Sequence, residues 1–198
     1  MGNALAIETL RARLAELEGP RAEVRRVPSG VAWLDTLARG LPRPGLVELA
    51  GVPGSGRMRA ALALAAAEPA TAWVDCERLL YPPAALAHGV DLAAQLWIQP
   101  TADRCIWAAE QVLRSGCFAL VIVVEPPALG RAGARWVHAA EAGACTGLVL
   151  SSRPQRSLPA DLRLQAHRGE LTVARDRGGQ LGGRSAAPAW PAGMEPLR

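Results

Sequence analysis

The sequence predicts a single α/β domain whose mostly parallel sheet is covered by helices on both faces. Short runs that are apolar on both faces, as buried parallel strands are, alternate with helical patterns along the middle of the chain. A glycine-rich loop, GVPGSGRM at 51–58, stands between a predicted strand and a predicted helix. The 198 residues, half of them hydrophobic and a fifth charged, are enough for one such domain and its core.

The expected elements follow one another in a simple order. Ile7, Leu10, Leu14 and Leu17 recur at spacings of three and four, which predicts an amphipathic helix over residues 1–20. The α/β core then runs over 24–177, with strands at 46–50, 71–75, 96–99, 120–124 and 147–150, helices at 30–39, 57–68, 101–115 and 131–143, and a hairpin of 162–167 with 170–175. Residues 178–198, rich in Gly, Pro and Ala, predict a flexible tail.

Composition and charge favour a cytoplasmic protein. The longest apolar run, at 118–124, is too short to cross a membrane. The N-terminal residues carry acids and arginines where a signal peptide would have an apolar stretch. The net charge is +4 and all 22 basic residues are arginine, which permits a nucleic-acid partner without requiring one.

Cysteines and tryptophans are expected mainly inside the domain. The four cysteines are scattered and form no CxxC pair, which favours reduced, partly buried side chains over a zinc site or a redox pair. We therefore expect no bound metal. Five tryptophans fall in predicted helices or strands and are expected in the core: Trp33, Trp73, Trp97, Trp107 and Trp136.

The loop at 51–58 has the glycine spacing of a phosphate-binding P-loop. Gly51, Gly54, Ser55 and Gly56 would let the backbone wrap a phosphate, and the next helix would supply free N–H groups. Two positions depart from the pattern, because Arg57 and Met58 stand where a nucleotide-hydrolysing loop has Lys and then Ser or Thr. A thioether is a poor ligand for Mg²⁺. We expect a degenerate P-loop with weak or lost nucleotide binding, no catalytic residue and no cofactor.

Acidic residues follow two of the predicted strands. Glu125 follows 120–124, where a P-loop enzyme has the Asp that binds its metal ion. Asp75 and Glu77 end or follow 71–75 and would face the same crevice, since ligands lie beyond the carboxyl ends of parallel strands. A carboxylate there would activate water, but we favour the interpretation that these two are solvated loop acids.

The order of these segments resembles the RecA ATPase core. The resemblance spans residues 24–127 and rests on VPSGVAWLDTLARGLPRPGLVELAGVPGSGR, WVDCERLLYPPAALAHGVDLAAQLWIQP and VLRSGCFALVIVVEP. It implies a three-layer RecA-like P-loop NTPase core with a mostly parallel sheet. It places Arg57 and Met58 at the P-loop lysine and threonine, Glu77 at the catalytic glutamate and Glu125 at the metal-binding aspartate. The segments that follow, PPALGRAGA and SRPQRSLPAD, are short and lack an aromatic residue for base stacking, which argues against filaments on DNA.

This truncated pattern with a basic ending resembles the ImuA family of RecA-like proteins. The resemblance implies a non-catalytic accessory subunit of a damage-induced translesion DNA synthesis complex, associated with the nucleoid when in that complex. The implied partners are an ImuB-like relative of the Y-family polymerases, an error-prone replicative-type polymerase and RecA itself. Two alternatives stay open, namely a SulA-type cell-division inhibitor and an ATP-dependent, DNA-binding RecA-like recombinase.

Basic residues dominate the C-terminal part of the chain. A binding surface for DNA or for an acidic partner segment and a merely solvated face are equally weighted interpretations of Arg153, Arg156, Arg163, Arg168, Arg175, Arg177 and Arg184. Trp190, in AAPAWPAGMEPLR, is either an anchor for a partner or part of a disordered end.

Overall fold

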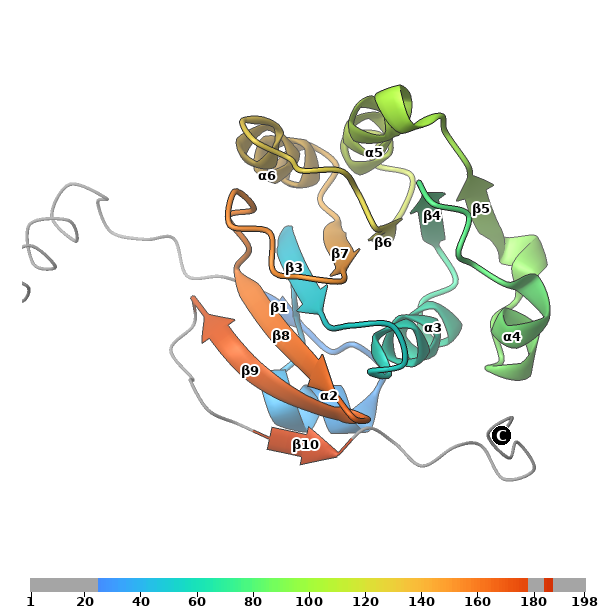
Figure 1. Cartoon of the computed structure of the whole chain (residues 1–198), viewed down its shortest axis with the longest axis vertical. Helices are drawn as coiled ribbons and strands as arrows, with labels where there is room; N and C mark the ends of the chain where they lie inside the picture. Colours follow the sequence, from blue (N-terminus) through green and yellow to red (C-terminus); the bar gives the residue numbers. More distant parts are fainter. Residues whose placement is uncertain (1–24, 178–183, 187–198) are drawn as a thin grey trace, which may run out of the picture.

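The predicted α/β architecture is present in the computed structural model, which describes residues 25–177 and 184–186 (Figure 1). Eight strands form one sheet in the order β10-β9-β8-β3-β7-β6-β4-β5. They are β3 (Gly45–Ala50), β4 (Thr71–Asp75), β5 (Gln95–Ile98), β6 (Leu120–Val124), β7 (Thr146–Ser151), β8 (Leu162–His167), β9 (Glu170–Asp176) and β10 (Arg184–Ala186). The helices are α2 (Ala32–Ala38), α3 (Arg57–Ala67), α4 (Pro82–Ala87), α5 (Cys105–Arg114) and α6 (Ala132–Ala142), with 3-10 turns η1 (Leu92–Ala94) and η2 (Ala102–Arg104).

The strands from β8 to β5 in this order are parallel, so their carboxyl ends meet at one edge of the sheet. The glycine-rich loop follows β3 at that edge, and the segments after β4, β6 and β7 emerge beside it. β9 and β10 add antiparallel strands at the other side. This is the RecA-like α/β fold that the sequence predicts.

Each face of the sheet carries its own hydrophobic core, because successive side chains of a strand point to opposite faces. On β6, Leu120, Ile122 and Val124 belong to one buried cluster and Val121 and Val123 to the other. The first cluster includes residues of α2, α3 and α4, and the second includes residues of α5 and α6. The sheet is therefore the middle of three layers, which explains why its central strands are mostly apolar on both faces.

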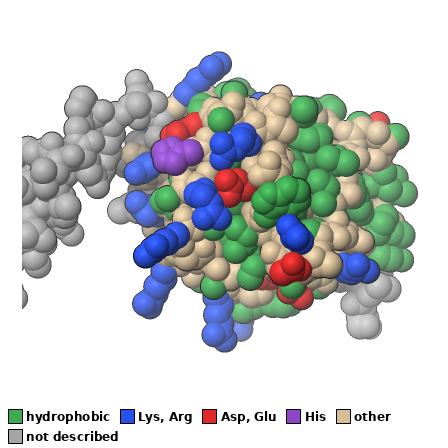
Figure 2. Space-filling model, turned by 90° about the horizontal axis from the view of Figure 1, so that it is seen from above, with side chains coloured by type: hydrophobic (Ala, Val, Ile, Leu, Met, Phe, Trp, Pro, Cys, Tyr) green, Lys and Arg blue, Asp and Glu red, His purple; other side chains and the backbone are tan. Residues whose placement is uncertain are grey.

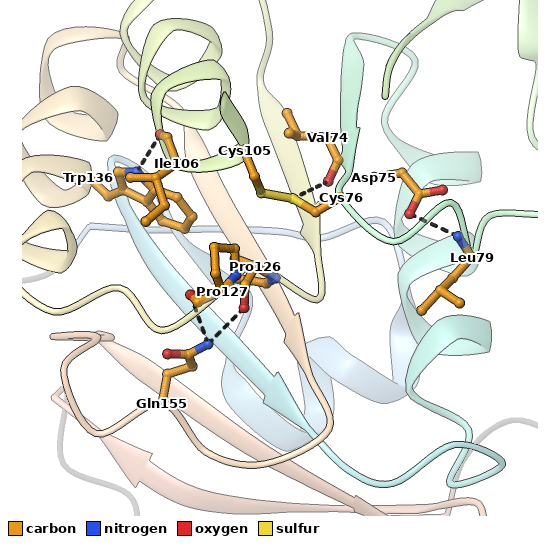
Figure 3. The surroundings of a disulfide bond; sticks show 10 residues. All are labelled: Val74, Asp75, Cys76, Leu79, Cys105, Ile106, Pro126, Pro127, Trp136 and Gln155. Carbon is orange, nitrogen blue, oxygen red and sulfur yellow. Dashed lines mark hydrogen bonds between the residues drawn. A yellow bond between two sulfur atoms is a disulfide. The ribbon is translucent and has the colours of Figure 1, made fainter. Parts of the chain in front are cut away.

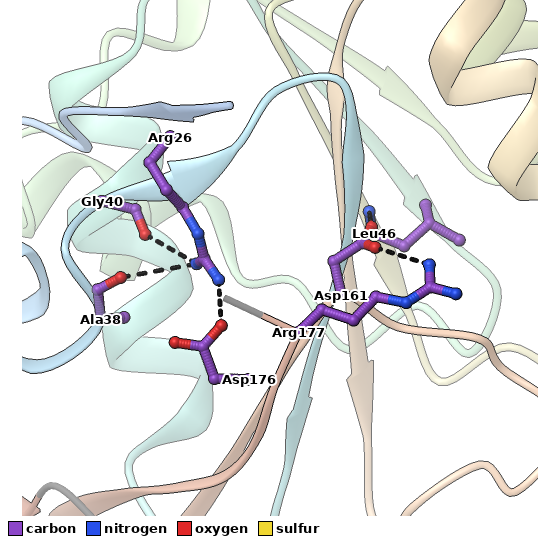
Figure 4. A network of polar contacts seen from close by, with 7 residues as sticks. All are labelled: Arg26, Ala38, Gly40, Leu46, Asp161, Asp176 and Arg177. Carbon is purple, nitrogen blue, oxygen red and sulfur yellow. Dashed lines mark hydrogen bonds and ion pairs between the residues drawn. The ribbon is translucent and has the colours of Figure 1, made fainter. Parts of the chain in front are cut away.

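Ion pairs fasten the β8–β9 hairpin to the rest of the domain (Figure 4). Arg177 Nη1 lies 3.0 Å from Asp161 Oδ1, and the other oxygen of Asp161 accepts a 3.0 Å hydrogen bond from the amide of Leu46. Arg26 pairs with Asp176 and also donates to the carbonyl oxygens of Ala38 and Gly40. The end of β9 is thus tied both to β3 and to the segment around α2.

Several boundaries differ from the sequence prediction. The predicted strand at 96–99 is β5, which lies one residue earlier, and the helix expected at 101–115 is divided into η2 and α5. Two short strands, β1 (Arg26–Val27) and β2 (Leu41–Pro42), pair in a separate antiparallel sheet. Residues 184–186, assigned to the flexible tail, pair with β9 as β10. The expected N-terminal helix at 1–20 lies outside the described residues.

The tryptophans are only partly where the sequence places them. Trp73 and Trp136 are fully buried, and Trp33 and Trp97 pack against the core while partly exposed. The prediction is wrong for Trp107, whose residue is 57% exposed on α5. This helix buries one face only, and Trp107 lies on the other, a distinction that a helical pattern with several large apolar residues does not make.

The prediction of four reduced cysteines is also wrong, because Cys76 and Cys105 form a disulfide with Cα atoms 5.7 Å apart (Figure 3). β4 and β5 are parallel neighbours, so the segments that follow them meet at one edge of the sheet. Cys76 directly follows β4, and Cys105 begins the helix after β5. Cys117 and Cys145 are free. Within the described part of the chain, no helix has the length and apolar character needed to cross a membrane.

Candidate functional site

The glycine-rich loop joins β3 to α3 with the backbone shape that its glycines permit. Gly54 and Gly56 have φ angles of +80° and +97°, a region that disfavours side chains. At Gly51 there is no room for a side chain, since a Cβ atom would lie 2.5 Å from Ser55 Oγ and 2.6 Å from the carbonyl oxygen of Ala166. The turn of the β8–β9 hairpin supports the loop from outside, with Gly169 N donating to Ser55 O at 3.0 Å. The predicted loop residues therefore form one compact turn ahead of α3.

Arg57 begins α3 but turns away from the role of a P-loop lysine. The residue is 7% exposed, and its Nη2 forms an ion pair with Oε1 of Glu125 at the end of β6. Met58, the next residue, is partly buried and packs against the core cluster of α2, α3 and α4. The structure thus brings together Arg57 and Glu125, which are far apart in sequence, and turns Met58 toward the protein interior.

Glu125 is the centre of a network at the carboxyl edge of the sheet. Its Oε2 accepts from Ser152 N at 3.0 Å, and its Oε1 accepts from Ser152 Oγ at 2.5 Å besides pairing with Arg57. Burial by itself raises the pKa of Glu125, but hydrogen bonds from Ser152 and then the contact with Arg57 outweigh it and hold the pKa below its ordinary value. Glu125 is therefore a carboxylate whose two oxygens are both engaged by protein groups.

Two buried donor atoms near the loop form no hydrogen bond within the described part of the chain. These atoms are Arg57 Nη1 and Ser55 Oγ. Ser55 Oγ lies close to Gly51, where an added Cβ atom would be 2.5 Å away from it.

Asp75 and Glu77 have different surroundings, which corrects the interpretation of both as solvated acids. Asp75 is 2% exposed, and its carboxylate accepts hydrogen bonds from Leu79 N at 3.0 Å and Leu80 N at 2.9 Å. It shapes the segment after β4, as a capping residue shapes a turn. Glu77 is exposed, as the sequence predicts. The structure thus leaves one of the two available at the crevice.

A buried glutamate that the sequence reasoning missed lies in the middle of β3. Glu48 is fully buried, pairs with Arg163 on β8, and accepts hydrogen bonds from Ser151 Oγ at 3.1 Å and Gln155 N at 2.5 Å. Its signal was present, since one acid interrupts the apolar strand GLVELA. Glu48 holds the segment after β7 against the sheet.

The arginines proposed as a binding surface do not form one group. Arg163 is engaged with Glu48 and with the carbonyl oxygens of Gln155 and Leu158, and Arg177 is paired with Asp161. The exposed ones are Arg153 and Arg156 on the segment after β7, Arg168 in the hairpin turn and Arg175 on β9. For Arg184 the structure describes the strand and not the side chain, and Trp190 lies outside the described residues. Figure 2 views the molecule from the side that carries α5 and α6, and arginine side chains are prominent on this face.

Comparison with known proteins supports the resemblance to RecA. Protein RecA of Rhodococcus jostii is 36% identical over 119 residues, which are 57% of this chain and 34% of that protein. Protein RecA of Salinispora arenicola is 37% identical over 119 residues, with the same coverage. Protein RecA of Kineococcus radiotolerans is 36% identical over 124 residues, 59% of this chain and 35% of that protein.

No family model matches the chain. The chain spans about a third of the length of the RecA proteins that it matches. Together with the sheet order and the loop between β3 and α3, these matches show a RecA-like α/β core that is similar to RecA itself.

Proposed function

We propose that this protein is a non-catalytic, RecA-like accessory subunit of a damage-induced translesion DNA synthesis complex. It would bridge or regulate an ImuB-like relative of the Y-family polymerases and an error-prone polymerase. The observation that carries the non-catalytic part is the ion pair between Arg57 and Glu125.

This ion pair takes both charges that a P-loop enzyme would direct at a nucleotide. The cation at the start of α3 is held by a carboxylate of the protein instead of facing a terminal phosphate. A guanidinium is planar and has fixed donor directions, so the Nη2 that pairs with Glu125 is not directed at a phosphate as a compact lysine ammonium would be. Arg57 therefore acts as a structural cation.

The carboxylate is equally unsuited to hold magnesium. Both oxygens of Glu125 accept hydrogen bonds from Ser152, and one also contacts Arg57. Mg²⁺ requires near-octahedral oxygen ligands and is bound in nucleotide sites partly by a hydroxyl, for which Met58 offers a thioether. Hydrolysis would need Glu125 to exchange its present partners for a metal ion.

The accessory role rests on the resemblance to the ImuA family and on the short segments after β6 and β7. Adaptor proteins need a stable fold with exposed binding surfaces. A RecA-like core in which the cation after the glycine-rich loop is paired with a carboxylate of the protein would supply such a scaffold without a nucleotide cycle. RecA, the third partner in this proposal, has a related core through which contact would be made.

Calorimetric titration with ATP and Mg²⁺ tests the non-catalytic part. We expect no heat of binding at millimolar nucleotide and no phosphate release. A variant with Arg57→Lys, Met58→Thr and Glu125→Asp serves as the positive control, because it restores the three P-loop groups together. Micromolar binding and turnover by the natural sequence would overturn the proposal and favour the recombinase alternative.

Co-expression with an ImuB-like protein tests the accessory part. We expect a complex that survives size-exclusion chromatography, and we expect it unchanged when ATP is added or omitted. Cell filamentation on overproduction without DNA damage, in the absence of any such complex, would instead favour the SulA-type inhibitor.

A further inference from the structure

The pair of Cys76 and Cys105 lies outside the glycine-rich loop and has the asymmetry of a site for thiol–disulfide exchange. Cys76 is half-buried at the end of β4, whereas Cys105 is fully buried at the first position of α5 (Figure 3). Cys76 is thus the more accessible residue of the two, although it also packs against the core cluster of α5 and α6. Cys105 lies at the first position of a helix, where the first-turn N–H groups favour a negative charge.

The disulfide encloses residues 77–104, which include β5, the outermost strand at one side of the sheet. This side is called the β5 edge below. This segment contains α4, η1, β5 and η2, and β5 pairs with β4 only. Four of the six large hydrophobic residues that are exposed in the described chain belong to it: Leu79, Tyr81, Leu86 and Leu96. Leu80, Ala85 and Val90 anchor the segment in the core, but its strand β5 has only one neighbour in the sheet, so we expect its order to depend more on local contacts than that of the central strands.

Non-covalent contacts also tie the enclosed segment to the domain, beginning with the pairing of β5 with β4. The carboxylate of Asp75 holds the amides of Leu79 and Leu80. The side chain of Gln95 accepts from Trp73 Nε1 at 2.6 Å and donates to Ala65 O at 2.9 Å. The segment also forms all four walls of a surface hollow of about 300 Å³, lined by Pro82, Leu92, Gln95 and Trp97. The covalent bond adds to these contacts by joining the two ends of the segment that lines the hollow.

We propose that the disulfide between Cys76 and Cys105 forms and breaks reversibly with the redox conditions, and that it controls the order of residues 77–104. In the oxidising direction, the protein dithiol and glutathione disulfide give the protein disulfide and two molecules of glutathione. The order of residues 77–104 would then change with the ratio of glutathione to glutathione disulfide. This property is independent of the nucleotide site and of the partners proposed above.

The reducing direction follows from the burial of the two residues, since Cys76 is the less buried one. A glutathione thiolate attacks Cys76 Sγ, the Sγ–Sγ bond breaks, and Cys105 leaves as a thiolate at the start of α5. A second glutathione thiolate then attacks the glutathione sulfur of the mixed disulfide. Cys76 leaves as a thiolate, and the products are the protein dithiol and one glutathione disulfide.

Thiol counting in glutathione buffers tests the exchange itself. The protein is equilibrated over a range of glutathione to glutathione disulfide ratios, quenched with acid, denatured and alkylated. Mass spectrometry should show two alkylated cysteines in the oxidised protein and four in the reduced protein, since the chain has four cysteines of which Cys117 and Cys145 are free. Denaturation is needed because burial raises the pKa of Cys145 to about 11 and leaves its thiol unreactive in the fold.

Two matched variants separate the pair from the other thiols. After proteolysis of the oxidised protein, a peptide containing Cys76 should be found disulfide-linked to a peptide containing Cys105. Cys105→Ser should abolish this linked peptide and the change of two in the number of alkylated cysteines. Cys117→Ser, at an exposed free cysteine, should leave both unchanged. An oxidised protein that carries only glutathione on Cys76, or a linked peptide that never forms, would overturn the proposal. The natural sequence alone gives this result, so the test does not depend on the folding of a variant.

Hydrogen–deuterium exchange tests the consequence for the β5 edge. On reduction, amides of residues 77–104 should exchange about tenfold faster or more, because the open state regains the loop entropy that the cross-link removes. Amides of β3, β6 and β7 should not change. Equal exchange rates of the β5 amides in the oxidised and reduced proteins would contradict the proposal that the disulfide controls this segment. Failure to form a complex with the ImuB-like protein in the co-expression experiment would bear only on the proposed function.

Discussion

Arg57 at the start of α3 and Glu125, which follows β6, form an ion pair across the carboxyl edge of the sheet, although they lie 68 positions apart in the chain. β3 and β6 are separated by β7 in the sheet, so the pair spans from the glycine-rich loop over the end of β7. Ser152, which follows β7, completes the contact by donating twice to the same carboxylate. The loop is therefore held by its own neighbours.

Glu125→Gln should destabilise the protein by about 1–3 kcal/mol, because it leaves the buried Arg57 without its counter-charge. The loss stays in this range because the pair is partly open to solvent. Chemical denaturation at neutral pH measures this loss. Glu141→Gln, at an exposed acid paired with His138, is the control and should change the free energy of unfolding by less than about 0.5 kcal/mol.

The same pair predicts a pH dependence. Since the pKa of Glu125 is lower in the folded protein than its ordinary value of 4.5, its stabilisation is complete above that value and is lost as the pH falls through the folded pKa. Unfolding curves of the natural protein and of Glu125→Gln should therefore converge as the solution is acidified below about pH 4. Curves that stay parallel at all pH values would contradict a stabilising carboxylate at this position.

Arg163→Ala should destabilise the protein by about 3–5 kcal/mol, because it leaves Glu48 charged and fully buried without a cation. The double variant Glu48→Leu with Arg163→Leu should recover most of this loss, since apolar side chains of similar volume replace the pair. Arg175→Ala, at an exposed position of β9, is the control for removing an arginine. A loss as small as that of the control would show that Glu48 does not depend on Arg163.

Asp75→Ala should cost about 2 kcal/mol, because the amides of Leu79 and Leu80 lose a charged acceptor in a buried position. Glu77→Ala, two residues later at an exposed acid, should be nearly neutral. The two free energies of unfolding distinguish the roles directly. Equal effects would show that Asp75 is no more structural than Glu77.

Gly51→Ala should be more destabilising than Gly54→Ala. At Gly51 the new methyl group would meet Ser55 Oγ and the carbonyl oxygen of Ala166 at under 3 Å, and moving backbone is costly. At Gly54 no atom lies within 4 Å, so only the positive φ of +80° opposes the change, at about 1 kcal/mol. Thermal denaturation of both variants measures the difference, and the reverse order would contradict close packing under the loop.

The sequence by itself determined the fold class, the order of the core elements and the unusual loop. Buried parallel strands need side chains that are apolar on both faces, and this pattern is local, so β3, β4, β6 and β7 could be predicted from their composition. Arg57 and Met58 were equally visible, because the spacing of a P-loop lies within eight consecutive residues.

Only the tertiary structure decided what these side chains contact. The ion pair of Arg57 with Glu125, the burial of Glu48 beside Arg163 and the bond between Cys76 and Cys105 all join segments that are adjacent in the sheet and distant in the chain. The order of parallel strands sets such contacts, and local periodicity carries no record of it. A helical pattern likewise did not reveal that Trp107 lies on the exposed face of α5, because which face is buried depends on the helix that packs against it.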